Sequence, residues 1–379
     1  MVQEQEKSLQ TKYLLGDLKL SNRVVMASLT RARATNPEIA PTGLHAQYYS
    51  QRASAGLILT EGVWVSKRAI GFLNIPGIYT QHQTDAWKKV VNAVHEKKGR
   101  IFLQLSHVGA ASHPDYFDGD LPLGPSAINI REKSFTPEGF KDTVTPKAYS
   151  IREIKETITE YRHAALNAKA ADFDGVELHA QLFTLIPQFL SKATNQRTDE
   201  YGGSIENRCR ILFEILDALI GVFPGKKVGI KFTPAVFNAG IIKPDENTIP
   251  TYNYIFRQLN HYDIAFVELV GPSVDLRDTA IAALKENFYG HFRAIYKGTL
   301  IANLGFNRET GNAIIAAGNA DLVSFGEPFI ANPDLVERFL NSWPLATGDP
   351  ATYYAGGEKG YIDYPYANSI HDENKRKIA

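Results

Sequence analysis

Short apolar runs alternate along the chain with longer segments whose apolar positions have helical spacing. The short runs are rich in β-branched residues and apolar at consecutive positions, which is typical of strands buried on both faces. Several longer segments begin with capping residues, as in Ser150 with Glu153, Thr80 with Gln83, and Asn307. The pattern predicts eight strands, at residues 23–28, 57–62, 100–105, 174–178, 227–232, 264–269, 299–303 and 321–325.

Eight successive strand–helix units favour a parallel sheet closed into a (β/α)8 TIM barrel of the α/β class. Residues 13–20 (YLLGDLKL) place a Gly-Asp turn between apolar pairs, which predicts a hairpin plugging the amino-terminal mouth. Residues 106–149, rich in Gly, Pro, Asp and Ser, follow the third strand, and loops of that length are usually functional. We expect them to form a lid over the pocket, within a single domain of residues 1–379.

The composition of the chain indicates what kind of molecule the protein binds. Forty-one basic and forty-one acidic residues give a net charge of zero, so no overall field attracts nucleic acid or an anionic membrane. No apolar run is long enough to span a bilayer, and the amino-terminal residues are polar, so we expect a cytoplasmic protein. Cys209 has no partner for a disulfide and is expected to be a structural thiol. We expect a small-molecule partner, no metal, and a monomer or homodimer.

His179 is the most informative single residue. It directly follows the predicted strand at 174–178, and a long loop dense in polar residues and glycine comes after it. In α/β barrels the chemistry takes place at the carboxyl ends of the strands. His179 is therefore a candidate for function, with a buried, hydrogen-bonded core histidine as the alternative.

Five motifs follow one another along nearly the whole chain: TEG at 60–62, QLSHVG at 104–109, NQRTDEYGGSIENR at 195–208, NPDLVER at 332–338 and GYIDYP at 360–365. Together they resemble the Old Yellow Enzyme family of NADH:flavin oxidoreductases, which includes 12-oxophytodienoate reductase-like enzymes. The resemblance implies a barrel with FMN across its carboxyl mouth. In the family, NADPH reduces the flavin, and the flavin passes hydride to the β-carbon of an enone.

The resemblance also implies roles for single residues. On the flavin side it implies contacts from four residues: Thr30, Gly62, Gln104 and Lys231, the last standing where the family has an arginine. On the substrate side it implies that His179 binds the carbonyl and that Tyr361 lies in the active site. His107 is a further candidate proton carrier.

The segment HAQLFTLIPQFL, which begins at His179, departs from the family pattern. The family's carbonyl-binding partner and proton-donating tyrosine are replaced by Leu182 and Thr184, and a shift of one residue would put Gln181 and Phe183 there. A threonine hydroxyl is far too weak an acid to replace a phenol as proton donor. The usual second half of ene reduction therefore lacks its usual residue.

A second departure concerns the flavin phosphate. Where the family has a glycine-rich turn, this chain has Leu304 and Gly305, and where the family has Gly-Arg it has Gly326 and Glu327. At about 4 Å and an effective dielectric near 20, one pair of unit charges is worth about 4 kcal/mol, so reversing the sign is costly. We expect FMN to be bound weakly or not at all.

Three functions follow from these departures. The first is a redox-neutral, flavin-independent double-bond isomerase that acts on an enone by proton transfer, with His179, Tyr361 and His107 as catalytic groups. The second is an FMN- and NADPH-dependent ene-reductase with an unusual phosphate site, and the third is a non-catalytic ligand-binding barrel. Ser106 stands where several relatives carry tryptophan, which predicts room for a large apolar enone. We expect a divergent, fungal member of the family that acts in secondary metabolism.

Overall fold

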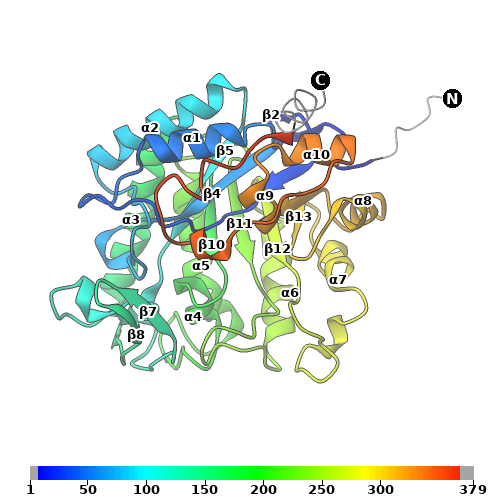
Figure 1. Cartoon of the computed structure of the whole chain (residues 1–379). Coiled ribbons are helices and arrows are strands. Elements are labelled where there is room, and N and C mark those ends of the chain that lie inside the picture. The colour runs from blue at the N-terminus through cyan, green and yellow to red at the C-terminus, as the bar shows by residue number, and fades with distance from the viewer. Residues whose placement is uncertain (1–6, 368–379) are drawn as a thin grey trace, which may run out of the picture.

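A computed structural model describes residues 7–367 and shows eight parallel strands closed into a barrel (Figure 1). The strands are neighbours in the order β10-β11-β12-β13-β14-β3-β4-β5, and the register is parallel throughout. All eight predicted strands are confirmed: β3 Val24–Met26, β4 Leu57–Trp64, β5 Ile101–Ser106, β10 Gly175–Ala180, β11 Val228–Phe232, β12 Phe266–Val270, β13 Leu300–Asn303 and β14 Leu322–Phe325.

Helices surround the barrel, as burial of both strand faces requires. Predicted capping residues lie where the sequence indicated: Thr80 Oγ accepts from the Gln83 N–H, and Ser150 Oγ accepts from the Glu153 N–H, both at 3.2 Å. The helices are α1 Gly43–Gln51, α2 Gln81–Glu96, α3 Ile151–Ala170, α4 Leu185–Leu190, α5 Ile205–Ile220, α6 Thr248–Leu259, α7 Phe288–Ile295, α8 Arg308–Ala316, α9 Glu327–Ala331 and α10 Leu335–Asn341.

The predicted amino-terminal hairpin is confirmed and closes one end of the barrel. It consists of β1 (Tyr13–Leu15) and β2 (Leu18–Leu20), paired antiparallel. Leu15 and Leu20 belong to the same buried cluster as inward-facing strand residues such as Phe102 and Phe266. The hairpin thus seals the amino-terminal mouth with apolar side chains.

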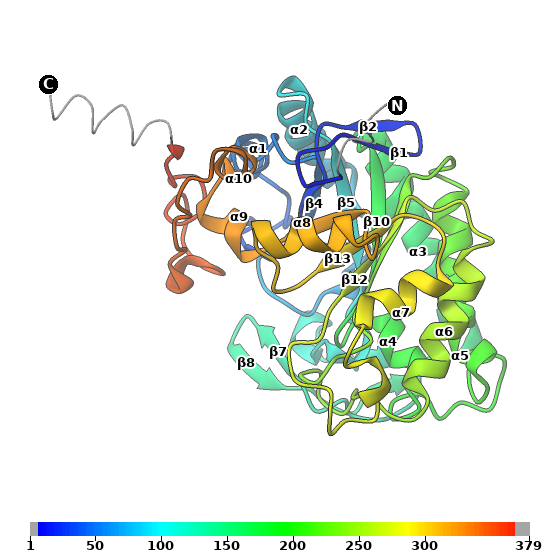
Figure 2. The same cartoon turned by 90° about the vertical axis from the view of Figure 1, so that its right-hand side faces the viewer.

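Residues 106–149 lie at the opposite end of the molecule from the hairpin (Figure 2). The segment contains two small sheets, which pair β6 (Leu123–Gly124) with β9 (Lys147–Ala148) and β7 (Lys133–Thr136) with β8 (Gly139–Asp142). Hydrogen bonds fix it to neighbouring loops: Arg197 Nη1 donates to the carbonyl of Pro125 at 2.9 Å, and the Ile241 N–H donates to the carbonyl of Ile130 at 2.9 Å. The position of the insertion agrees with the prediction, and its action as a lid stays a prediction.

Further expectations concerned Cys209, membrane-spanning segments and the bounds of the domain. Cys209 is buried within α5, as expected for a structural thiol. No helix between residues 7 and 367 combines the length and apolarity needed to cross a bilayer. The single domain predicted for residues 1–379 extends at both ends beyond the described part of the chain.

Close packing inside the barrel makes a glycine in β11 sensitive to substitution. A Cβ at Gly229 would lie 2.2 Å from Phe266 Cζ, so Gly229→Ala forces the ring or the strand to move. We expect Gly229→Ala to lower the free energy of unfolding by about 1–3 kcal/mol, measured by urea titration.

Gly43→Ala is the matched control, because a Cβ at Gly43 in the first turn of α1 meets nothing within 4 Å. We expect that variant to be as stable as the wild type or slightly more stable. Equal unfolding midpoints for the two variants would contradict this account of the barrel interior.

Candidate active site

His179 lies near the carboxyl end of β10, beside the last residue of the neighbouring strand β5. Ser106 Oγ and His179 Nδ1 are 2.9 Å apart, whereas His179 Nε2 is buried and has no hydrogen-bond partner. Burial, helped by the nearby charge of Lys231, lowers the pKa of His179 from 6.5 to about 3. In the tautomer in which Ser106 donates to Nδ1, the proton is on Nε2. His179 then has one buried, neutral N–H without an acceptor.

Gln104 and Gly62 lie next to this histidine. The strand pair β4–β5 contains a register shift between Leu59 and Gly62, which brings Gly62 opposite Gln104. A Cβ at Gly62 would lie 3.3 Å from Gln104 Oε1, 3.4 Å from Ser106 Cβ and 3.6 Å from His179 Nδ1. Gly62 is itself buried, and a Cβ at this position would be in tight contact with the Gln104 amide.

The barrel interior below Gln104 carries a buried carboxyl group, Glu177. Gln104 Nε2 donates to Glu177 Oε2 at 2.7 Å and to Ser28 Oγ at 2.8 Å. Burial, together with the nearby charge of Glu268, raises the pKa of Glu177 well above its usual range. Burial beside a second carboxyl group thus favours the neutral form of Glu177.

Lys231, near the end of β11, forms an ion pair with Glu268 of β12. Lys231 Nζ and Glu268 Oε1 are 3.2 Å apart, and the side chains are only 4% and 0% exposed. Ser324 Oγ also donates to Glu268 Oε1, at 2.6 Å. The charge of Lys231 is therefore compensated inside the protein.

A cavity of about 580 Å³ opens at the carboxyl ends of the strands. Its wall includes Ser28 and Leu29 after β3, Lys231 of β11, and the residues that follow β13 and β14. Such a volume is typical of a pocket for a small organic ligand. This cavity is the candidate active site, although His179, Gln104 and Gly62 are not among the residues that line it.

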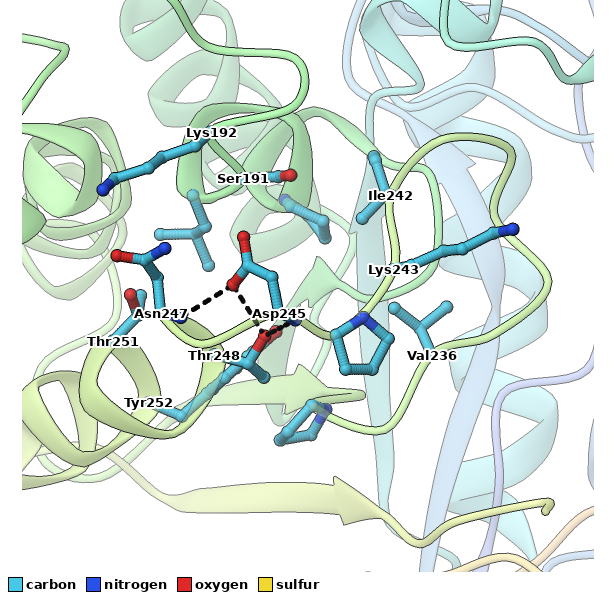
Figure 3. A pocket seen from close by; sticks show the side chains of 14 residues that line it. Ser191, Lys192, Val236, Ile242, Lys243, Asp245, Asn247, Thr248, Thr251 and Tyr252 are labelled. Atoms are coloured by element: carbon cyan, nitrogen blue, oxygen red, sulfur yellow. Dashed lines mark hydrogen bonds between the residues drawn. The ribbon is translucent and has the colours of Figure 1, made fainter. Parts of the chain in front are cut away.

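A second cavity lies between the end of α4, the loop after β11 and the start of α6 (Figure 3). It has a volume of only about 40 Å³. Its carboxylate, Asp245, accepts hydrogen bonds from the Asn247 N–H and from Thr248 Oγ of its own loop (Figure 3). The space is sufficient for water rather than for a substrate.

Sequence comparison identifies the family. Residues 13–345 match the NADH:flavin oxidoreductase / NADH oxidase family. The chain belongs to this family. The Old Yellow Enzyme resemblance of the sequence motifs is thereby confirmed.

Relatives of this chain are named as reductases. The chain is 40% identical to 12-oxophytodienoate reductase 1 of Oryza sativa subsp. japonica, over 98% of this chain and 96% of the relative. It is 42% identical to a probable flavin mononucleotide-dependent alkene reductase of Leishmania infantum, over 93% and 96% of the two chains. The structure of morphinone reductase in complex with tetrahydroNAD superposes with a TM-score of 0.89 at 41% identity, covering 96% and 99%. A fungal origin and a role in secondary metabolism stay predictions.

The residues at one end of the site fit the ring end of a flavin. Gln104 and Lys231 place polar groups at one side of the carboxyl mouth, and the buried Gly62 lies between Gln104 and His179. Thr233 Oγ and one oxygen of Glu177 are buried in the structure without a hydrogen-bond partner. Buried polar atoms without partners are rare, and a polar ring could satisfy some of them. Thr30, predicted to contact the flavin, is half-buried just after Leu29 of the cavity wall.

The other end of the cavity does not fit a flavin phosphate. Leu304 is in the wall with φ +82° and a side chain that is 44% exposed, and Gly305 follows with φ +77°. Glu327 follows Gly326, and its Oε1 accepts a hydrogen bond from the Tyr353 hydroxyl at 3.2 Å. The structure thus places all four predicted phosphate-site residues at the cavity, with an acidic rather than a basic side chain among them.

The residues predicted to line the substrate pocket occupy different surroundings. Leu182 is in the cavity wall, and with Phe183 it packs on a small apolar cluster around Val236. Thr184 Oγ donates to the backbone carbonyls of Gln181, at 2.8 Å, and His179, at 3.2 Å. Its hydroxyl is committed to the turn, in keeping with the prediction that it is no proton donor.

Tyr361 and His107, predicted as proton carriers, lie in buried networks of their own. Tyr361 stacks on Tyr48 with ring centroids 4.1 Å apart and is fully buried. His107 Nδ1 accepts from the Gly109 N–H at 2.9 Å, and its Nε2 is 3.5 Å from the Tyr149 hydroxyl. Within residues 7–367 no hydrogen bond or ring contact joins either residue to His179. Their catalytic role stays a prediction that this geometry does not favour.

Sequence reasoning missed the polar residues below the cavity. Side chains alternate between the two faces of a strand, and Glu177 lies two residues before His179, so both point to the same face. This alternation could have identified Glu177 from the sequence. The missed residues are Ser28, Glu177, Glu268 and Ser324. Ser28 and Glu177 are hydrogen-bonded to Gln104, whereas Glu268 and Ser324 form a second group with Lys231 and Asn303.

The Lys231–Glu268 pair can be tested through stability. Lys231→Met leaves a buried carboxylate without its cation, so we expect the free energy of unfolding to fall by about 3–5 kcal/mol in urea titration at pH 7.5. Adding Glu268→Gln removes the uncompensated charge, and the double variant should recover most of the loss. A double variant no more stable than Lys231→Met would contradict the pairing.

Proposed function

We propose that the protein is a flavin-dependent reductase of α,β-unsaturated carbonyl compounds that takes its reducing equivalents from NADPH or NADH. The free Nε2 of His179, next to the polar residues that fit a flavin ring, carries the proposal. The names of the relatives support reduction, and none of those reported above is an isomerase. The isomerase that the sequence departures favoured therefore gives way to the reductase that was its alternative.

His179 would bind the substrate carbonyl. The Nε2–H donates to the carbonyl oxygen and withdraws electron density from the conjugated double bond, which makes the β-carbon a better hydride acceptor. Ser106 keeps the ring oriented through Nδ1. A bound flavin would supply the hydride.

The second step, protonation of the α-carbon, has no donor in Thr184. Its hydroxyl already donates to two backbone carbonyls, and its acidity is too low for the task. We propose that solvent entering the open mouth supplies this proton. The apolar side chains of Leu182 and Phe183 favour a substrate that is apolar beyond its carbonyl.

The central test is replacement of His179. We expect His179→Ala to lower kcat/KM for 2-cyclohexen-1-one by about 10²–10³-fold, as for removal of one oxyanion-stabilising donor. The measurement is anaerobic NADPH oxidation with excess flavin and analysis of the saturated product. His163→Ala, on the exposed face of α3, is the matched control and should keep wild-type activity.

The outcome of that assay also separates the three functions. Migration of the double bond without consumption of NADPH would establish the isomerase in place of the reductase. Binding of the enone without any turnover, unaffected by His179→Ala, would indicate the non-catalytic barrel.

The pH dependence of enone binding tests the charge state of His179. Because its pKa is lowered to about 3, the imidazole stays neutral from pH 5 to pH 8. We expect the Kd for the enone to be constant across this range in equilibrium titrations. An inflection near pH 6.5, where an unperturbed histidine gains its proton, would contradict the burial of this group.

A further inference from the structure

The loops after β13 and β14 occupy the place where TIM barrels commonly bind a phosphate group. These are the seventh and eighth barrel strands, and the short helix α9 begins directly after β14. Phosphate sites in this fold use the backbone N–H groups of these two loops and a short extra helix. In this protein the two loops contribute Leu304, Gly305, Gly326 and Glu327 to the wall of the mouth cavity.

The charges around the cavity are unfavourable for a phosphate. Among the residues that line it, Lys231 is the only cation, and its charge is compensated by Glu268 at 3.2 Å. The only acidic side chain of the wall, Glu327, is exposed, and no ion pair within residues 7–367 compensates it. A phosphate dianion at this end would meet a like charge and no free cation.

Leu304 adds a steric obstacle. Its φ of +82° is in the left-handed region, where glycine is the favoured residue, yet it carries an isobutyl side chain that is 44% exposed in the cavity wall. A glycine would add no side chain beside the backbone N–H groups of the turn, whereas the leucine places an apolar side chain next to them. The turn therefore has the backbone conformation that glycine favours, but its surface is the apolar side chain of Leu304.

We propose that Leu304 and Glu327 form a rim that excludes phosphate and selects a flavin whose side chain ends in a hydroxyl group, as in riboflavin. Leu304 packs against the carbon chain of the ligand, and the carboxylate of Glu327 accepts a hydrogen bond from the terminal hydroxyl. The inference rests on the proposed function, because it requires a flavin ring at the Gln104 and Lys231 end.

The test compares two ligands that differ only in the phosphate group. The purified full-length chain is titrated with riboflavin and with FMN at 20 mM and 500 mM NaCl, and quenching of flavin fluorescence gives each Kd. We expect riboflavin to bind at least about tenfold more tightly than FMN at low salt. The Kd for FMN should fall at high salt because the repulsion is screened, and that for riboflavin should stay constant.

Two substitutions test the residues themselves. Glu327→Arg should lower the Kd for FMN at least about tenfold and leave that for riboflavin within about threefold. Leu304→Gly should also favour FMN, without changing the salt dependence. Glu96→Arg, an equal charge change at the end of α2 near the amino-terminal side of the barrel, should change neither Kd and is the matched control.

Each other outcome contradicts a defined part of the proposal. FMN binding as tightly as riboflavin, or a chain that purifies with stoichiometric FMN, would overturn the inference and leave the reductase intact. A preference for riboflavin that survives Glu327→Arg and Leu304→Gly would remove the assignment to these residues. Failure of both flavins to bind would overturn the flavin dependence of the proposed function as well.

Discussion

Closure of eight parallel strands into one barrel is the constraint from which the site follows. Because all eight strands run in the same direction, their carboxyl ends meet at one rim, and residues distant in sequence become neighbours there. Ser106 and His179 are 73 positions apart, yet their side chains are 2.9 Å apart because β5 and β10 pair directly. The amino-terminal hairpin closes the other end, so polar groups inside the barrel face the ligand side only.

The same closure brings charged groups into an interior that cannot hydrate them. Glu177, Lys231 and Glu268 lie on the adjacent strands β10, β11 and β12, and each is almost completely buried. Lys231 and Glu268 compensate each other in an ion pair, and burial raises the pKa of Glu177, which favours its neutral form. This compensation leaves no free positive charge for an anionic ligand, although a lysine is present in the cavity wall.

The sequence predicted the fold well because its signals are local. Strands apolar on both faces, and capping pairs such as Thr80 with Gln83, depend on neighbouring residues and appear in the structure where expected. The site was predicted only in part. A motif gives the position of Tyr361 in the chain, but its stacking on Tyr48 depends on tertiary packing. The polar group around Glu268 joins four strands, and single-strand periodicity does not show which inward residues meet.

The two ends of the mouth are built from different strands. Because of this separation, a member of the family can keep the residues at the ring end and differ at the end that contacts the tail of the cofactor. Gly62, Gln104 and His179 come from β4, β5 and β10, whereas Leu304 and Glu327 follow β13 and β14. In the closed strand order, β13 and β14 are each at least two strands away from β5 and β10, so side chains at the tail end can change without disturbing the strands that hold the ring end. The fold and the position of His179 therefore place no requirement on the charge of the ligand tail, which in our proposal depends on the residues of two short loops.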